Sequence, residues 1–382
     1  RAGVNAGNSI ASGGNYNVAV GDEAGTAITT GDQNVAIGYG AATALTTGAN
    51  IVAIGYLAGD AITTGENNIA IGKNALGAED THDFNIAIGS NALAVQNAGA
   101  DAYNVAIGHN AGTSVSTGIQ NVIIGGLAGD SLTDADFNIA IGYTALGLDT
   151  LGSRSIAIGH TALGAQNFTT ATNAYNVGVG HNAGGAITTG VQNTLIGGLA
   201  GDVLSDADFN VAIGYAALST DTLGSSSVAI GREALFTQNF TTATSAYNVA
   251  VGFQAGKLVT TGINNTLIGA FAGDKITTGD RNVALGQGSF TESTTGDNNT
   301  AIGTDALANN TTASSNTAVG KSALNANTSG AGNVAFGAEA LSVNVLGSNS
   351  TAIGREALRQ QNPATATDAH NTAVGYRAGL LV

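Results

Sequence analysis

Histidines and paired aspartates are the side chains of this chain whose types and spacing could bind a metal ion. His109, His160 and His181 each directly follow the glycine of a short repeated motif, and the last two fall in successive repeats. Imidazoles stacked one layer apart could hold Zn²⁺ or Ni²⁺. Exposed turn residues without a metal are the alternative, and this is the interpretation that we favour.

The second candidate for metal binding is an aspartate pair that occurs twice. Asp134 and Asp136 lie in the segment Asp-Ala-Asp-Phe-Asn, and Asp206 and Asp208 repeat it. Oxygen-rich turns of this kind suit Ca²⁺, which is the one cofactor that the sequence suggests. The glycine–aspartate nonapeptide of calcium-binding β-rolls is absent, so solvated turns remain the alternative.

Motifs for catalysis are missing. No Gly-x-x-x-x-Gly-Lys-Ser/Thr phosphate loop occurs, and the many glycines follow the period of the repeat. A Ser/His/Asp triad needs a pocket, which a narrow two-stranded coil does not offer. The chain has no Cys, which excludes disulfides and thiolate metal sites. We therefore expect no enzymatic activity.

Composition excludes several further classes. The 382 residues include 57 Gly without a three-residue period, which excludes collagen, and the 43% of hydrophobic residues argues against disorder. The net charge of −15 argues against nucleic-acid binding. No run of eighteen apolar residues occurs, so this segment is not expected to insert into a membrane. Because Met is absent, we expect a processed piece of a longer product.

A seventeen-residue repeat has to position all of these side chains. It begins at Asn17-Val18-Ala19-Val20-Gly21 and recurs in 21 copies, the last at Asn371-Thr372-Ala373-Val374-Gly375. Sixteen of the 20 intervals are 17 residues long, and the others are 19, 21, 21 and 21. Residues 1–16 form a degenerate first coil, and residues 17–382 form one continuous repeat domain. Repeats of this length are typical of solenoids.

The chemistry of one unit predicts short strands and turns. Positions 2 and 4 are apolar or Thr and lie on the same side of a strand, so we expect them to point into a core. Position 5 is always Gly, as expected for a positive-φ corner or a close backbone approach. Position 8 is Ala except at Ser289, which indicates a site without room for a larger side chain. Thr-Thr-Gly and Gly-Asp-Asn segments are typical of turns.

One unit cannot fold alone. Ordering 17 residues costs about 25 kcal/mol, and a lone coil of small apolar residues cannot bury the roughly 1,000 Å² that would offset it. Stacked coils bury their edges against one another. The sequence therefore predicts an all-β parallel solenoid of about 21 coils of 17 residues, with ladders of equivalent residues: Gly21, Gly38, Gly55, Gly72 and Gly89 at position 5, and Asn17, Asn34, Asn68 and Asn85 at position 1.

Four expanded turns leave the coil at the same point, at residues 96–103, 166–175, 238–247 and 361–370. Two of them end near-identical blocks, residues 104–175 and 176–247. Insertions on one side of a solenoid often bind ligands. We expect the turns to protrude and their aromatic residues to pack between subunits or to contact a ligand; these residues are Tyr103, Phe168, Tyr175, Phe240 and Tyr247.

The repeat resembles a known family at the motif level. Asn349-Ser350-Thr351-Ala352-Ile353-Gly354-Arg355-Glu356-Ala357-Leu358 is similar to the head repeat of YadA-like trimeric autotransporter adhesins, as is Ser226-Ser227-Val228-Ala229-Ile230-Gly231. Related repeats occur in phage fibres, and the resemblance covers residues 17–382. It implies a left-handed parallel β-roll, three chains side by side, and attachment to cell surfaces or matrix. In such a trimer, Ala19, Ala36 and Ala53 would suit close packing between chains.

Three functions remain open from the sequence. The first is an extracellular fibre or adhesin-like shaft on a cell or virion surface, whose partners are further copies of the chain and a glycan or matrix protein. The second is a structural filament that assembles end to end without a specific ligand, because uncapped solenoid ends invite pairing. The third is ice binding by threonine rows such as Thr29-Thr30 and Thr46-Thr47, which are interrupted at Asp80-Thr81.

Overall fold

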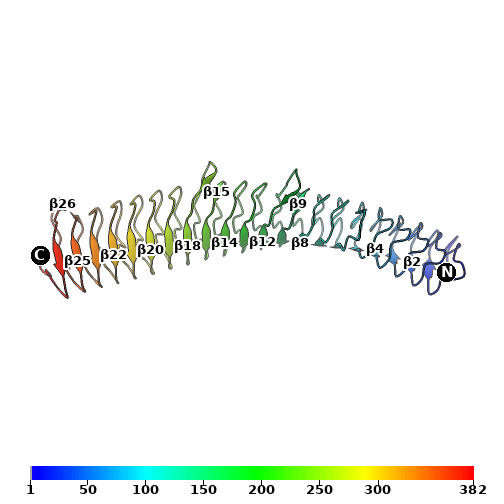
Figure 1. Cartoon of the computed structure of the whole chain (residues 1–382), viewed down its shortest axis with the longest axis horizontal. Coiled ribbons are helices and arrows are strands. Elements are labelled where there is room, and N and C mark those ends of the chain that lie inside the picture. Colours follow the sequence, from blue (N-terminus) through cyan, green and yellow to red (C-terminus); the bar gives the residue numbers. More distant parts are fainter. Residues whose placement is uncertain (1) are drawn as a thin grey trace. The chain divides into compact units, whose positions relative to one another are not determined.

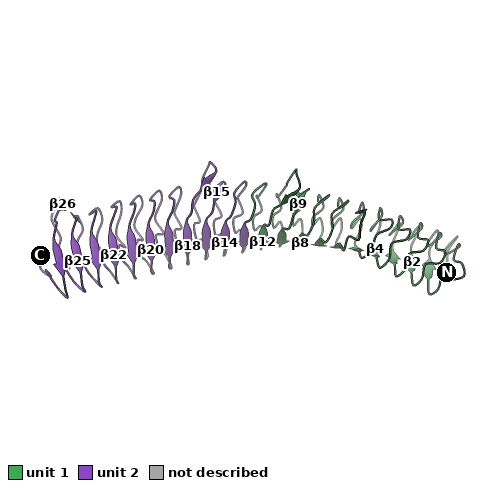
Figure 2. Ribbon diagram, viewed as in Figure 1, with its two compact units in different colours: residues 1–192 green, residues 193–382 purple. Residues whose placement is uncertain are grey.

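The protein is described from a computed structural model that covers residues 2–382. It divides into two compact units, residues 1–192 and 193–382 (Figure 2), and each unit is described by itself. The described residues contain short β-strands and turns and no helix. This confirms the all-β class and the parallel solenoid of about 21 coils of about 17 residues.

Unit 1 contains ten three-residue strands that fill positions 2–4 of successive coils, and one additional two-stranded ladder. The strands of the main sheet are β1 (Val18–Val20), β2 (Val35–Ile37), β3 (Val52–Ile54), β4 (Ile69–Ile71), β5 (Ile86–Ile88), β6 (Val105–Ile107), β7 (Val122–Ile124), β8 (Ile139–Ile141), β10 (Ile156–Ile158) and β12 (Val177–Val179). The additional ladder is β9 (Gly152–Ser153) with β11 (Thr172–Asn173).

Unit 2 has the same plan with eleven main strands and two additional ladders. The main strands are β13 (Thr194–Ile196), β14 (Val211–Ile213), β16 (Val228–Ile230), β18 (Val249–Val251), β19 (Thr266–Ile268), β20 (Val283–Leu285), β21 (Thr300–Ile302), β22 (Thr317–Val319), β23 (Val334–Phe336), β25 (Thr351–Ile353) and β27 (Thr372–Val374). The ladders are β15 (Gly224–Ser225) with β17 (Thr244–Ser245), and β24 (Gly347–Ser348) with β26 (Thr367–Asp368).

Within each unit every main strand pairs in parallel with the equivalent strand of the next coil, as the stacked arrows of Figure 1 show. Val18 pairs with Val35 and Val35 pairs with Val52, so the register advances by one whole repeat at each step. Each position of the repeat therefore forms a row along the stack. This is the geometry that the constant spacing predicts.

The invariant glycine at position 5 is required by the distance between coils. Gly38 has a φ of 129°, and a Cβ added there would lie 2.4 Å from the carbonyl oxygen of Gly55. Gly55 stands in the same relation to Gly72, at 2.6 Å. Any side chain in this row would therefore collide with backbone, which is rigid, and the glycine ladder is a consequence of close stacking.

The orientation predicted for the strands is wrong. Ala36 at position 3 is fully buried, whereas Val35 and Ile37 at positions 2 and 4 are only half-buried. The interior of the coil is narrow at the strand and has room for little more than a methyl group there, so the β-branched residues point outward. Ala19, Ala36 and Ala53 consequently line the interior and cannot pack between chains, which corrects the second expectation.

One branched or aromatic side chain per coil fills the space beside these alanines, and it comes from position 9 or from position 12. Nine coils have Gly at position 9 and Ile, Leu or Val at position 12, as in Gly59 and Ile62. Eleven have Leu or Phe at position 9 and a polar residue at position 12, as in Leu146 and Asp149. A Cβ on Gly59 would lie 2.9 Å from Cδ1 of Ile62, so the two choices exclude each other.

Asparagines at position 1 tie the coils together through the backbone. Nδ2 of Asn34 donates to the carbonyl oxygen of Gly48 at 2.9 Å, and its Oδ1 accepts from the backbone N–H of Ile51 at 2.9 Å. The side chain thus closes its own coil and joins the next one. Asn17 and Asn68 make the same pair of contacts. Bonding is mainly from amide to backbone, rather than from amide to amide as in the ladder that we expected.

Residues 2–16 continue the stack beyond the first repeat. Ala2 forms a parallel bridge with Val20, and Ala6 is buried as position 8 is elsewhere. The backbone N–H of Gly7 donates to the carbonyl oxygen of Ala24 at 2.9 Å. This segment lacks a strand of its own but has the shape of a coil, in keeping with its degenerate sequence.

Candidate functional site

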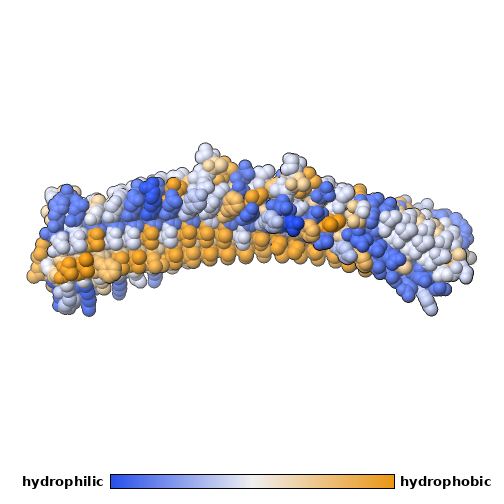
Figure 3. All heavy atoms as spheres, in the orientation of Figure 1, coloured by the Kyte–Doolittle hydropathy of each residue, from blue (hydrophilic) through white to orange (hydrophobic). Residues whose placement is uncertain are grey.

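The most extensive exposed feature of each unit is a row of apolar side chains that we call the outer sheet face, formed by positions 2 and 4 of the main strands. In unit 1 its exposed members include Val18 and Ile107, at 45% and 37% exposure. In unit 2 Leu285 and Phe336 are 44% and 56% exposed. Figure 3 shows these residues as a hydrophobic band. Soluble monomers seldom leave a contiguous apolar strip of this kind open to water.

The outer sheet face is regular as well as apolar. Coils repeat about every 4.8 Å, so the ten main strands of unit 1 carry a strip roughly 48 Å long. Pairing is in register throughout, and no charged residue interrupts positions 2 and 4 in any coil. A straight, uncharged surface of this length can be covered by a similar surface of another chain.

The expanded turns are built differently from the expectation that their aromatic residues face outward. Phe168 and Phe240 are buried, at 5% and 6% exposure, and each ring lies against a glycine, Gly152 or Gly224. They fill their own coil and cannot reach a ligand or a second subunit, which corrects that part of the prediction. β9 and β15 rise above the neighbouring coils in Figure 1, within their respective units.

Tyr103, Tyr175 and Tyr247, by contrast, are 50–59% exposed. They occupy position 17, where the backbone is left-handed, with φ near 50°. In unit 1 the ring of Tyr103 stacks on Phe84, with centroids 4.9 Å apart. The Arg154 guanidinium lies 4.5 Å from the Phe137 ring centroid and 6.0 Å from that of Tyr175. These rows offer ring edges and phenolic hydroxyls to the solvent.

A buried polar cluster supports each of the longer turns, and the sequence interpretation missed it. Asp149 Oδ1 accepts from the backbone N–H groups of Gly152 and Phe168, both at 3.1 Å. Its Oδ2 accepts from Gln166 Nε2 at 2.5 Å. The same Gln166 nitrogen donates to Ser155 Oγ, and its oxygen accepts from Asn176 Nδ2 at 2.9 Å. The turn is thereby anchored from inside the coil.

The same cluster recurs in unit 2, and there the sequence contains its signal. Asp221, Gln238 and Ser227 make the equivalent bonds at 2.6 and 3.0 Å. All three Ser residues at position 1, namely Ser155, Ser227 and Ser350, stand in coils with a 21-residue interval and a Gln at position 12. In the third coil of this kind Pro363 replaces the Phe, and because Pro has no N–H to donate, Asn344 suffices where the others have Asp.

The predicted histidine pair does come together. His160 and His181 stack with ring centroids 5.3 Å apart, and Tyr143 stacks on His160 at 5.5 Å. The rings lie nearly parallel, with an interplanar angle of 17°, so their nitrogens point alongside one another rather than toward a common point. This geometry suits ring stacking, and the metal site considered for the pair has no third ligand among the described residues near it.

The predicted calcium residues bond to the preceding coil. Asp134 Oδ1 accepts from Thr117 Oγ1 at 2.7 Å, and Asp136 Oδ1 accepts from the Ile119 backbone N–H at 2.8 Å. Neither they nor Asp206 and Asp208 belong to a group of three metal-ligating side chains in the described part of the chain. Calcium binding there stays a prediction.

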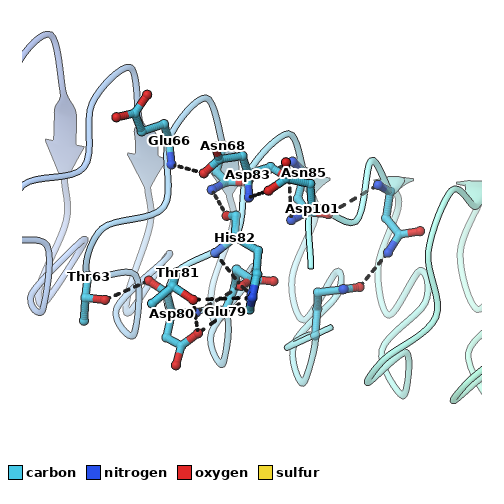
Figure 4. A network of polar contacts seen from close by, with 12 residues as sticks. Thr63, Glu66, Asn68, Glu79, Asp80, Thr81, His82, Asp83, Asn85 and Asp101 are labelled. Atoms are coloured by element: carbon cyan, nitrogen blue, oxygen red, sulfur yellow. Dashed lines mark hydrogen bonds and ion pairs between the residues drawn. The ribbon is translucent and has the colours of Figure 1, made fainter. Parts of the chain in front are cut away.

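The one such group within residues 2–382 is formed by Glu79, Asp80 and His82, in a turn that the sequence interpretation did not single out. His82 Nδ1 lies 2.9 Å from Glu79 Oε1, which also accepts from the backbone N–H groups of Asp80 and His82, both at 3.2 Å. Figure 4 shows these contacts converging on Glu79. Burial raises the pKa of Glu79, although the bonds from His82 and Asp80 act in the opposite direction.

A groove of about 420 Å³ opens on unit 1, and the duplicated block closes it in unit 2. Asp130, Gly147, Gly164 and Gly185 line it, together with Leu148 and hydroxyl-bearing threonines. Burial raises the pKa of Asp130. Seventy-two residues further on, Ser219, Phe236 and Lys257 replace the three glycines, so the space holds side chains of the chain itself.

Charges in unit 2 are paired where unit 1 leaves the groove open. Lys257 Nζ donates to Glu233 Oε2 at 2.7 Å and lies 5.9 Å from the Phe236 ring centroid. The bond from Lys257, with further donors on Gln254 and Arg232, lowers the pKa of Glu233 to about 2. The groove of unit 1 is thus the region where the two blocks differ most in access.

The comparisons with known proteins give no relative. No protein-family model matches the chain, and the search of curated proteins finds no match. Among residues 2–382 there is no helix of the length and hydropathy needed to cross a membrane.

Proposed function

We propose that this chain is a subunit of an extracellular, adhesin-like fibre in which three copies associate side by side through their outer sheet faces. The observation that carries the proposal is the uncharged apolar row at positions 2 and 4, which stays exposed in the single chain. Left-handed winding of the coils and a location on a cell or virion surface are parts of the same proposal.

The physical reason for association is the hydrophobic effect. A strip of half-exposed Val, Ile and Leu side chains gains about 25 cal/mol for each Å² that it removes from water. Side-by-side packing lets every coil contribute, so the gain grows with the number of coils. Turns and polar rows on the remaining surface stay in contact with water and keep the assembly soluble, helped by the net charge of −15.

Native mass tests the association. A wild-type particle should have about three times the 37.3 kDa mass of one chain. Ile54→Lys with Ile71→Lys should yield single chains that keep their β-sheet circular dichroism, because both side chains already face outward in one chain. Asn50→Lys, on an exposed turn, is the matched control. Single wild-type chains at high concentration would exclude the proposal.

Attachment to a glycan or matrix protein is the second half of the proposal, and two surfaces support it. The exposed tyrosines of the expanded turns are one, and the groove at Asp130 is the other. We expect Tyr175→Ser with Tyr247→Asn to weaken adhesion, since Ser and Asn occur at position 17 of other coils and preserve the fold. Binding to a glycan array and to immobilised matrix proteins is the measurement.

The groove has its own test. Gly164→Phe with Gly185→Lys copies the side chains of the duplicated block and should fill the cavity without disturbing the stack. If this variant and the tyrosine variant both adhere as the wild type does, the adhesive half of the proposal fails. A structural fibre without a specific ligand would then be the better description, as the regular outer sheet face also allows.

A further inference from the structure

The turn at residues 79–82 departs from the repeat at three positions, and each change introduces a metal-ligating group. Position 15 is Gly or Ala in the other fifteen coils of 17 residues and His82 here. Asp80 is the only carboxylate at position 13, and Glu79 is the only Glu at position 12. A turn that only had to connect two coils would have kept Thr-Thr-Gly, as the preceding coil does at Thr63-Thr64-Gly65.

The three side chains lie close enough to share one ion. His82 Nδ1 is 2.9 Å from Glu79 Oε1 and 3.9 Å from Asp80 Oδ1, and one ligand atom from each residue falls within 4.8 Å of the others (Figure 4). Ligands of a tetrahedral Zn²⁺ at about 2.0–2.1 Å from the metal stand about 3.3 Å apart. Small side-chain rotations would reach that arrangement.

The second, independent observation is an unsatisfied buried oxygen. Glu79 is fully buried, and its Oε2 has no hydrogen-bond partner. In the equivalent clusters the following coil supplies one: Gln166 donates to Asp149 at 2.5 Å, and Gln238 donates to Asp221 at 2.6 Å. Gln96 occupies that place after Glu79, yet its own Nε2 is also without a partner. A buried carboxylate oxygen left in this state is costly unless a cation or another donor meets it.

Access from solvent completes the argument. The side chains of Asp80 and His82 are 46% and 18% exposed, so an ion can enter from the outside and keep a water ligand. Asp83 and Asp101 lie in the adjoining turns and add negative charge around the entrance. Imidazole nitrogen with two carboxylates is a ligand set for Zn²⁺ and its first-row neighbours, whereas Ca²⁺ favours six to eight oxygens.

We propose that Glu79, Asp80 and His82 bind one divalent transition-metal ion, with Zn²⁺ as the representative and water in the remaining position. The ion takes the place of the hydrogen between His82 Nδ1 and Glu79 Oε1, so binding requires Nδ1 to be unprotonated. It joins three residues of one turn to a side chain inside the coil. The metal site is independent of the proposed fibre and adhesive function.

Isothermal titration of the metal-free full chain with ZnCl₂ tests this. We expect one high-affinity ion per chain. Asp80→Thr with His82→Gly restores the residues of the preceding coil and should preserve folding while lowering the affinity for Zn²⁺ by more than about 100-fold, since loss of supporting outer groups alone costs 10–100-fold. His160→Gln with His181→Gln is the control and should bind as the wild type does. Zn²⁺ should raise the unfolding midpoint of the wild type and of this control only.

Three results would overturn the proposal. These are equal Zn²⁺ affinity in the Asp80→Thr, His82→Gly chain, loss of the site in the histidine-stack control, and absence of binding heat with Zn²⁺ up to millimolar concentration. Competition by an equal concentration of Ca²⁺ would also reject it, because the imidazole ligand would then be irrelevant.

Discussion

The adjoining coils 51–67 and 68–84 fill the same interior in opposite ways. The first has Gly59 at position 9 and Ile62 at position 12, and the isoleucine occupies the core. The second has Leu76 at position 9, and Glu79 at position 12 is left to bond the turn. Both coils stack with the same strand register. The interior therefore requires a volume, and the fold accepts it from either position.

The difference teaches why polar residues are buried in this solenoid. Once Leu or Phe supplies the volume from position 9, position 12 is free to cap the turn with its side chain, as Asp149 and Asn344 do toward the N–H of the glycine three residues on. Position 9 is left-handed, with φ of 50° at Leu76. Branching at Cβ is unfavourable in that region, which explains why Leu and Phe occur there and Ile and Val do not.

Filling both positions at once should have the largest effect. Gly59→Leu places a side chain where a Cβ alone lies 2.9 Å from Ile62 Cδ1. Overpacking and the left-handed backbone together should lower the free energy of unfolding by about 3 kcal/mol. Urea denaturation measures it. An unchanged midpoint would show that the two positions do not compete.

A double substitution should reverse most of that loss. Gly59→Leu with Ile62→Asn converts the coil to the second kind, with a leucine in the core and an amide that can cap Gly65. We expect it to unfold within about 1 kcal/mol of the wild type. Ile62→Asn alone, which leaves both positions without a large side chain, is the control and should be strongly destabilised. Additive effects of the two single changes would contradict the comparison.

Removing a polar cap should cost somewhat less than overpacking. Asp221→Ala strips three donors of their acceptor: the backbone N–H groups of Gly224 and Phe240, and Gln238 Nε2. Buried donors without partners suggest a loss of about 2 kcal/mol, with faster hydrogen exchange at Phe240. Asp221→Asn, which keeps the acceptor for the two N–H groups, should lie between this variant and the wild type.

The smallest effect concerns Asp at position 10, which follows Gly but never Leu: Asp60, Asp130, Asp202 and Asp274. Burial raises the pKa of Asp274 from 3.8 to about 6. The folded state therefore holds the proton more tightly than the unfolded chain, and the free energy of unfolding should fall as the pH rises from about 4 to about 6.

Asp274→Asn should remove that dependence. Its stability relative to the wild type should increase across this window and stay constant above about pH 7. Urea midpoints at several pH values provide the measurement. Parallel curves for the two proteins would show that Asp274 does not titrate differently on folding.

The sequence predicted the stack and its register because a constant period leaves few alternatives. It could not say which side of the strand faces inward, since alternation defines two sides without labelling them. Invariably small residues at position 8, and mostly Ala at position 3, indicated the narrow interior in retrospect. The exchange between positions 9 and 12 was visible as a correlation, but its meaning depends on the contact between Gly59 and Ile62.

The polar clusters were harder to foresee for a physical reason. Asp149, Gln166 and Ser155 lie on two coils and meet only because the stack brings equivalent positions together. Their partner across the turn, Phe168, was expected outside and lies inside. The metal-ligating turn at residues 79–82 needed no such contact to be noticed, because His82 stands alone among glycines and alanines.

In-register pairing also bears on how such a chain can change in length. The upper edge of each coil has the same hydrogen-bonding pattern as the edge that it covers, so the insertion or loss of whole coils creates no new kind of contact. The block 104–175 and its copy 176–247 are a duplication of this sort. Recombination within such a gene can therefore lengthen or shorten its product in whole-coil steps, while point changes at the glycine of position 5 are rejected.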